Sequence, residues 1–167
     1  MKKYELTTET LQLAGRTLHR IKALRDFGSV KEGQFGGWIE NEKNLSQDDN
    51  AWIYGEAMAF DNAKVFGNAN VSGDAWVSGN ANVSGNAKVS GDAEITNDCD
   101  YMVFKNNWSS GRYFTWTKSN NMWKVGCFYG TGEELIKKAY SESELKGKCY
   151  EKVVNFVKEL EEIKNNC

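Results

Sequence analysis

Apolar positions recur every sixth residue through the middle of the chain. From Ala51 onward, eight consecutive units begin with alanine, carry an aliphatic residue two places on and end in a turn-forming pair: AWIYGE, AMAFDN, AKVFGN, ANVSGD, AWVSGN, ANVSGN, AKVSGD and AEITND. Side chains two residues apart share one face of a strand. We therefore expect the alanine and the aliphatic residue of each unit to point inward, while the Gly-Asn and Gly-Asp pairs form corners.

A repeat of this kind predicts a triangular solenoid in which three units close one coil. Residues 18 apart then stack in neighbouring coils, about 4.8 Å from each other. Ile39 and Leu45 continue the aliphatic row toward the N-terminus, and two extra residues in SQDDN, just before Ala51, indicate a bulged corner. The solenoid is expected to begin between residues 15 and 35.

The pattern changes after Asp100. The segment 101–130 predicts two or three antiparallel strands joined by SSG and SNN turns. Thr131 and Glu134 form a capping box, which predicts a helix, and a second helix is expected after Ser141 and Glu144. One stripe of that second helix is expected to be buried: Cys149, Val153, Phe156, Val157, Leu160 and Ile163.

The repeats resemble the bacterial transferase hexapeptide family, whose members fold as left-handed parallel β-helices. The segments GGWIE, NLS and KVGCFYGTGEEL resemble hexapeptide-repeat proteins carried by bacteriophages and prophages. The expected fold is mainly β: a left-handed parallel β-helix with an N-terminal capping segment over residues 1–100, followed over residues 101–167 by a small α+β element of a β-hairpin and two helices.

Composition narrows the classes of partner. A formal net charge of -2 argues against binding of duplex nucleic acid or an anionic membrane surface, and no apolar run approaches the roughly 20 residues that span a bilayer. The four cysteines include no CxxC pair, which favours free thiols over a zinc site and indicates a reducing cytosol. With the phage resemblance, this predicts a cytoplasmic protein of a bacterial host.

Catalysis is not expected from the residues alone. The resemblance implies that an acyltransferase of this family would use a histidine base and bind acyl-coenzyme A between coils of a trimer. The one histidine, His19, precedes the repeats. The serines that recur once per repeat lack a converging histidine and acid. We therefore predict a protein that is not an enzyme and has no metal or cofactor.

One cluster in the C-terminal third combines aromatic and basic side chains. Its members are the predicted ligand-binding residues: Trp108, Arg112, Tyr113, Trp116, Lys118, Trp123 and Lys124. Alternation places Arg112, Trp116 and Lys118 on one face of a strand. The stripe is typical of a hairpin core or subunit contact, or of a pocket where a ring stacks on the aromatics while Arg and Lys bind phosphate.

The first hypothesis is a phage-type binding protein that sequesters a small anionic, nucleotide-like ligand, such as a signal of host defence. The alternatives are a module that docks a host or phage protein and an acyltransferase with an unrecognised base. The family resemblance also implies a homotrimer, which would bury exposed solenoid faces. Outward apolar residues on the early coils are the expected contacts: Tyr54, Met58, Phe60, Phe66 and Trp76.

Overall fold

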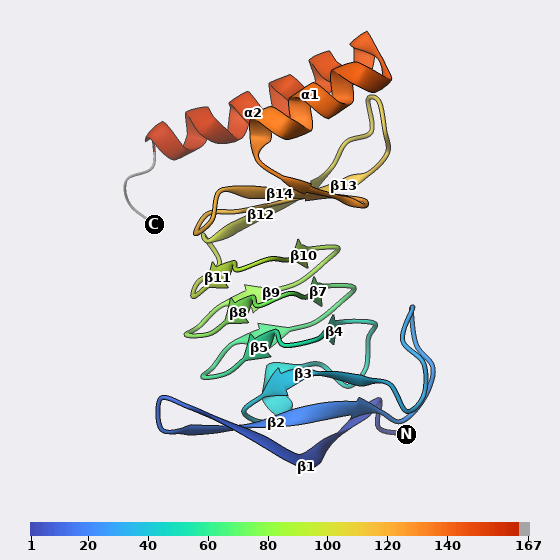
Figure 1. The fold of residues 1–167 in the computed structure, drawn as a ribbon, viewed down its shortest axis with the longest axis vertical. Coiled ribbons are helices and arrows are strands. Elements are labelled where there is room, and N and C mark those ends of the chain that lie inside the picture. Colours follow the sequence, from blue (N-terminus) through green and yellow to red (C-terminus); the bar gives the residue numbers. More distant parts are fainter. Residues whose placement is uncertain (164–167) are drawn as a thin grey trace.

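The computed structural model describes residues 1–163 and shows a solenoid closed at both ends by other elements (Figure 1). At the N-terminal end, β1 (Tyr4–Leu13) and β2 (Arg16–Ala23) form an antiparallel hairpin, and β2 pairs with β3 (Phe35–Ile39). A short 3-10 turn, η1 (Glu42–Asn44), follows. The hairpin lies across the first coil, so its buried residues join the solenoid core.

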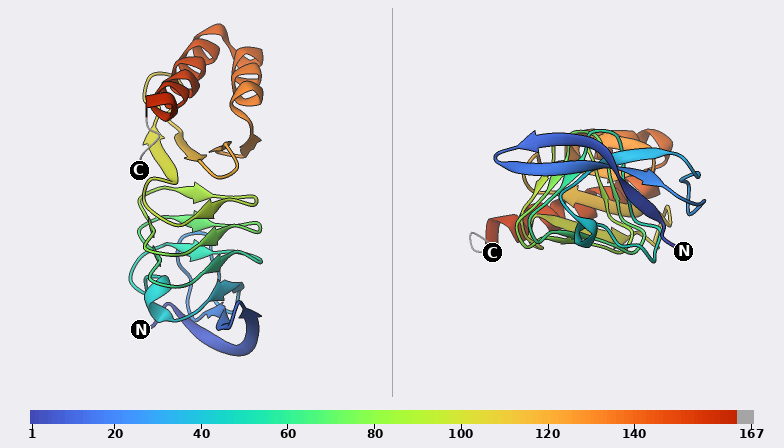
Figure 2. Two further views of the ribbon diagram at one scale, coloured as in Figure 1. Left: turned by 90° about the vertical axis from the view of Figure 1, so that its left-hand side faces the viewer. Right: turned by 90° about the horizontal axis from the view of Figure 1, so that it is seen from below.

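Eight strands of two residues form the solenoid: β4 (Trp52–Ile53), β5 (Met58–Ala59), β6 (Lys64–Val65), β7 (Asn70–Val71), β8 (Trp76–Val77), β9 (Asn82–Val83), β10 (Lys88–Val89) and β11 (Glu94–Ile95). They make three parallel ladders, β3-β5-β8-β11, β4-β7-β10 and β6-β9. Partners on β4 to β11 stand 18 residues apart, as Ile53 and Val71 do. The predicted fold class is confirmed, and the coils overlie one another when seen along their axis (Figure 2).

The core consists of the two inward positions of each repeat. Their alanines and aliphatic residues, such as Ala69 and Val71, are fully buried. At the corners, glycines such as Gly67 and Gly73 adopt positive φ, where a side chain would be strained. Backbone N–H groups on the flat sides donate to carbonyls of the next coil, for example Asn70 to Ala87 at 2.9 Å.

The bulged corner before Ala51 is confirmed by the register. Ile39 pairs with Ala59 and Leu45 with Val65, which are 20 residues apart rather than 18. Both Ile39 and Leu45 are fully buried. The first coil therefore starts at β3. The two extra residues are accommodated in the corner between Leu45 and β4.

The C-terminal unit holds one strand more than expected. β12 (Tyr101–Lys105), β13 (Tyr113–Thr117), β14 (Met122–Val125) and β15 (Phe128–Gly130) form an antiparallel sheet in sequence order. Two helices follow, α1 (Gly132–Glu142) and α2 (Glu144–Ile163), and the capping box of Thr131 and Glu134 is present. The sheet lies between the last coil and the helices (Figure 1).

Two expectations about this unit need correction. Helix α2 buries Tyr150, Val154 and Val157 against the sheet, whereas Phe156 and Ile163 of the expected stripe are exposed. Val157 of the stripe therefore lies on the buried face, whereas Phe156 and Ile163 lie on a second face of the helix. Cys99 is disulfide-bonded, so the prediction of a free thiol is wrong there. Cys127 and Cys149 are free, and Cys167 lies outside the described residues.

Candidate functional site

The C-terminal sheet separates the predicted ligand-binding residues, because its two faces are covered by different elements. Trp116 and Trp123 are cross-strand partners on β13 and β14. Both are buried in a cluster with Phe114 and Tyr150, beneath the helices. The Trp116 Nε1–H donates to Asn121 Oδ1 at 2.9 Å. These two rings contribute mainly to packing of the sheet against α2.

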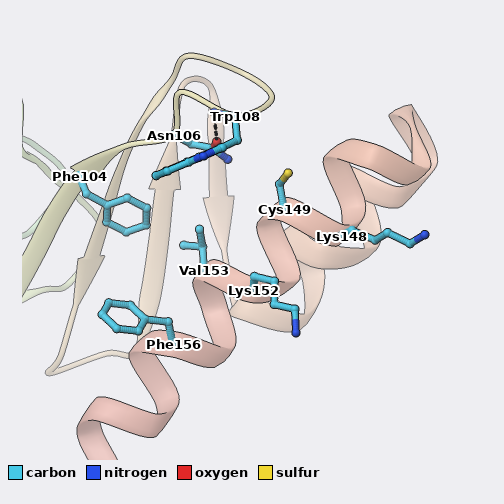
Figure 3. Close-up of a pocket in the computed structure, with 8 residues that line it drawn as sticks. All are labelled: Phe104, Asn106, Trp108, Lys148, Cys149, Lys152, Val153 and Phe156. Carbon is cyan, nitrogen blue, oxygen red and sulfur yellow. Dashed lines mark hydrogen bonds between the residues drawn. The ribbon is translucent and has the colours of Figure 1, made fainter.

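Trp108 stands apart from that pair. It is 78% exposed on the loop between β12 and β13. Its ring lies beside an apolar groove of about 620 Å³ between β12 and α2, which Phe104 and Phe156 also line (Figure 3). No acidic side chain lines this groove.

Arg112 and Tyr113 lie at a corner of the solenoid. With side chains of the later coils they line a cavity of about 270 Å³, here called the corner groove: Asn68, Asn86, Lys88, Gly111, Arg112, Tyr113 and Gly126. Lys105 approaches the same ring, with its Nζ 5.8 Å from the Tyr113 centroid. Its lining combines two cations, two side-chain amides and one aromatic ring, and it includes no carboxylate. Such a lining suits a phosphorylated ligand with a flat ring.

The two remaining predicted residues are elsewhere. Lys118 Nζ lies 3.9 Å from a Glu161 carboxylate oxygen, in a second cavity whose lining also includes Glu133 and Glu162. The three carboxylates there outnumber the two lysines, Lys118 and Lys158, which disfavours binding of an anion. Lys124 is half-buried on β14, where its cross-strand partners are Thr115 and Tyr129. The structure thus divides the predicted residues between two places: Trp116, Lys118 and Trp123 line the second cavity, and Arg112 and Tyr113 line the corner groove.

Sequence reasoning missed the solenoid residues of the corner groove. Lys88, Asn68 and Asn86 occupy ordinary repeat positions, and only the docking of β13 on β10 sets them beside Arg112. The backbone N–H of Lys88 donates to Thr115 Oγ1 at 2.9 Å. No sequence signal marks Lys88 as a groove residue. Lys88 and Lys64 hold the same place in their repeats, so the repeat alone cannot distinguish them.

His19 lies on β2, at the opposite end of the solenoid from the corner groove (Figure 1). Its Nδ1 is 3.3 Å from the Thr7 carbonyl oxygen. A carbonyl oxygen can only accept, so Nδ1 is the donor in this contact. The ring does not reach the corner groove within one chain.

Across residues 1–163, no group of three His, Cys, Asp or Glu side chains converges as a metal site would require. None of the described helices has the length and apolar character needed to cross a bilayer.

Comparison with known proteins adds one relative. No family model matches the chain. A segment of 69 residues is 38% identical to a protein of Escherichia coli (strain K12) named as the uncharacterized acetyltransferase YdcK, and the match covers 36% of this chain and 21% of that protein. The chain therefore spans about a fifth of the length of this relative. The solenoid and this similarity fit a hexapeptide-repeat protein.

The expectation that the chain is not an enzyme is corrected by this similarity. The protein of Escherichia coli is named as an acetyltransferase, which points to an enzyme. The earlier argument rested on the missing histidine in the coils. That argument excluded one kind of base, but not a donor site.

Proposed function

We propose that the protein is an acyltransferase of the hexapeptide-repeat class whose donor, a coenzyme A thioester, binds in the corner groove. The observation that carries the proposal is the lining of this groove, which Lys88 and Arg112 share with Tyr113 and no carboxylate. Within residues 1–163, neither cation lies within ion-pair distance of a carboxylate, although Arg112 also lines a small neighbouring cavity with Glu142. Lys88 and Arg112 therefore have donors to offer a phosphate.

Coenzyme A matches the groove in chemistry. It is a nucleotide with several phosphates and an adenine ring, so it satisfies the expectation of an anionic, nucleotide-like ligand. In the reaction, the lone pair of an amine or hydroxyl acceptor forms a bond to the thioester carbonyl. The carbon–sulfur bond then breaks and the thiolate leaves with the proton that the acceptor loses. The lining has no histidine or carboxylate, so we assign the groove to donor binding alone.

The expected homotrimer is part of this proposal. Phe66 and Trp76 are exposed on the solenoid surface, and apolar faces of this kind are commonly covered in oligomers. Phe60 is instead covered within the chain by Leu18 and Trp38, so it is not among the proposed contacts. Sequestration of a defence signal, docking of a host or phage protein and a phage origin stay predictions, because no contact among the described residues favours them.

The experiment that tests the proposal is a calorimetric titration of acetyl-coenzyme A into the wild type and two matched variants. Lys88→Gln removes a cation from the groove, and Lys64→Gln makes the same change at the same repeat position, away from it. We expect Lys88→Gln to weaken binding about tenfold, a typical effect of losing one charged hydrogen bond to phosphate. Lys64→Gln should bind like the wild type.

Two results would overturn the proposal. One is the absence of binding at millimolar ligand, and the other is an equal loss in both lysine variants, which would indicate attraction by overall charge. Release of free thiol from acetyl-coenzyme A in the presence of amine acceptors, followed with a chromogenic disulfide, then reports whether transfer occurs.

A further inference from the structure

Helix α2 carries two apolar faces, and within residues 1–163 only one of them is fully buried, while Cys149 and Val153 of the other are partly buried against the same cluster. Tyr150, Val154 and Val157 pack against the sheet. A second row, here called the outer seam, alternates steps of four and three residues: Cys149, Val153, Phe156, Leu160 and Ile163. Phe156 is 52% exposed and Ile163 is 80% exposed. Alternating steps of four and three are the spacing by which one helix packs along another.

The N-terminal half of the outer seam borders the apolar groove between β12 and α2. The rings of Phe104 and Trp108 form the opposite wall, facing Val153 and Phe156 (Figure 3). A helix laid along the seam would cover these rings. Large exposed aromatic side chains around a groove are characteristic of the centre of a protein interface.

Two charges beside the outer seam indicate what that helix is. Lys152 and Glu159 lie on the same flank of α2, and both are exposed. Within the described residues, neither takes part in an ion pair or a side-chain hydrogen bond. Lys152 is four residues before Phe156 and Glu159 is three residues after it. The seam is also nearly symmetric about Phe156, with Val153 and Leu160 on either side.

We propose that the outer seam pairs with the outer seam of a second copy of this chain, antiparallel and related by a twofold axis near Phe156. In antiparallel helix pairs, like flanks face each other. Lys152 of each copy then lies opposite Glu159 of the other, which gives two ion pairs. In a parallel pair, the flank of Lys152 and Glu159 would face the flank of Tyr150 and Val157 of the other copy. That flank is buried against the C-terminal sheet of its own chain.

The pair is modest in size. The outer seam covers about two heptads, or roughly 20 Å at 1.5 Å per residue. Short seams of this length associate weakly by themselves, so the pairing depends on protein concentration. This inference does not depend on acyl transfer, because it concerns the face of α2 remote from the corner groove.

Sedimentation equilibrium of the full chain tests the pairing. The mass of the wild-type particle should fall by half on dilution. This holds if single chains pair and equally if trimers pair. Phe156→Asp places a charge at the proposed axis and should leave only the half-mass particle at all concentrations. Lys137→Glu, at an exposed position on α1, is the control and should behave like the wild type. Equal masses for the wild type and Phe156→Asp would overturn the proposal.

Charge reversal tests the antiparallel orientation without touching the apolar residues. Lys152→Glu or Glu159→Lys alone creates two like-charge contacts and should weaken pairing at least severalfold. The double variant Lys152→Glu/Glu159→Lys restores opposite charges across the axis and should recover wild-type association. Unchanged pairing in the single variants, or no recovery in the double variant, would overturn the antiparallel arrangement.

Discussion

At the scale of single residues, the most unusual environment is that of Lys3. Its side chain is fully buried, with Nζ donating to the Ala51 carbonyl oxygen at 2.9 Å and lying 5.1 Å from the Phe27 ring centroid. Asp49 Oδ1 is 3.5 Å away. Burial lowers the pKa of Lys3 to about 8, although Asp49 acts in the opposite direction. Burying a cation here costs stability at neutral pH.

This environment predicts a pH dependence of stability. The unfolded chain keeps the Lys3 proton until its ordinary pKa of 10.5, whereas the folded chain releases it near pH 8. Between these values the unfolded state binds more protons, so the free energy of unfolding rises with pH, by about 2 kcal/mol from pH 8 to 10. In urea titrations, the free energy of unfolding of the wild type should rise by this amount relative to that of Lys3→Met between pH 8 and 10. Parallel pH trends in the two proteins would contradict the prediction.

At the scale of elements, the close packing of β3 on the solenoid explains why the GGWIE segment has glycine at position 37. A Cβ on Gly37 would lie 2.3 Å from the Ala57 carbonyl oxygen and 2.6 Å from Ile53 Cγ2. The strand can join the solenoid ladder only because this position has no side chain. The requirement is close approach of backbone, since Gly37 does not have a positive φ.

We expect Gly37→Ala to lower the free energy of unfolding by about 1–3 kcal/mol, the usual cost of overpacking in a rigid core. Phe35→Ala, on the same strand but 51% exposed, should change it by less than about 0.5 kcal/mol. Thermal and urea unfolding followed by circular dichroism give both values. A Gly37→Ala protein as stable as the wild type would show that β3 and its neighbours shift apart without cost.

The same elements show how far the sequence could predict the fold. The repeat predicted the core positions and the inserted corner, because a period of six leaves few ways to bury Val71 and its equivalents. The capping box predicted the start of α1, because Thr131 and Glu134 act locally. Alternation also placed Phe114 and Trp116 on one face of β13. It could not show that helices would cover that face, which depends on contacts distant in sequence.

The candidate site was harder to predict for the same reason. Arg112 and Tyr113 were recognisable as a cation beside an aromatic ring, but the other cation of the corner groove comes from β10, 24 positions earlier in the chain. A binding surface assembled from a solenoid corner and a separate sheet leaves no local motif. The sequence therefore identified two residues of the proposed donor groove, Arg112 and Tyr113, but not the solenoid residues that line it with them.

At the scale of the whole molecule, both open ends of the solenoid are covered. A parallel coil with nothing beyond it leaves backbone donors without partners, which invites edge-to-edge association. The hairpin of β1 and β2 covers one end. At the other end, side chains of the C-terminal unit accept from the last coil: Thr115 from the Lys88 N–H at 2.9 Å and Ser119 from the Glu94 N–H at 2.8 Å. Tyr101 similarly contacts the Ser84 N–H.

This junction predicts that the Thr115 hydroxyl is one of the groups that couple the two units. Thr115→Val keeps the shape of the buried side chain but leaves the Lys88 N–H without an acceptor, which should cost about 1–3 kcal/mol of stability. Hydrogen exchange should localise the effect, with protection of the Lys88 amide falling while that of Asn70, one coil earlier, is kept. Thr8→Val, at an exposed position, should leave both amides unchanged. If Lys88 stays protected in Thr115→Val, its amide has another partner, and the sheet covers the last coil through apolar packing rather than through this hydrogen bond.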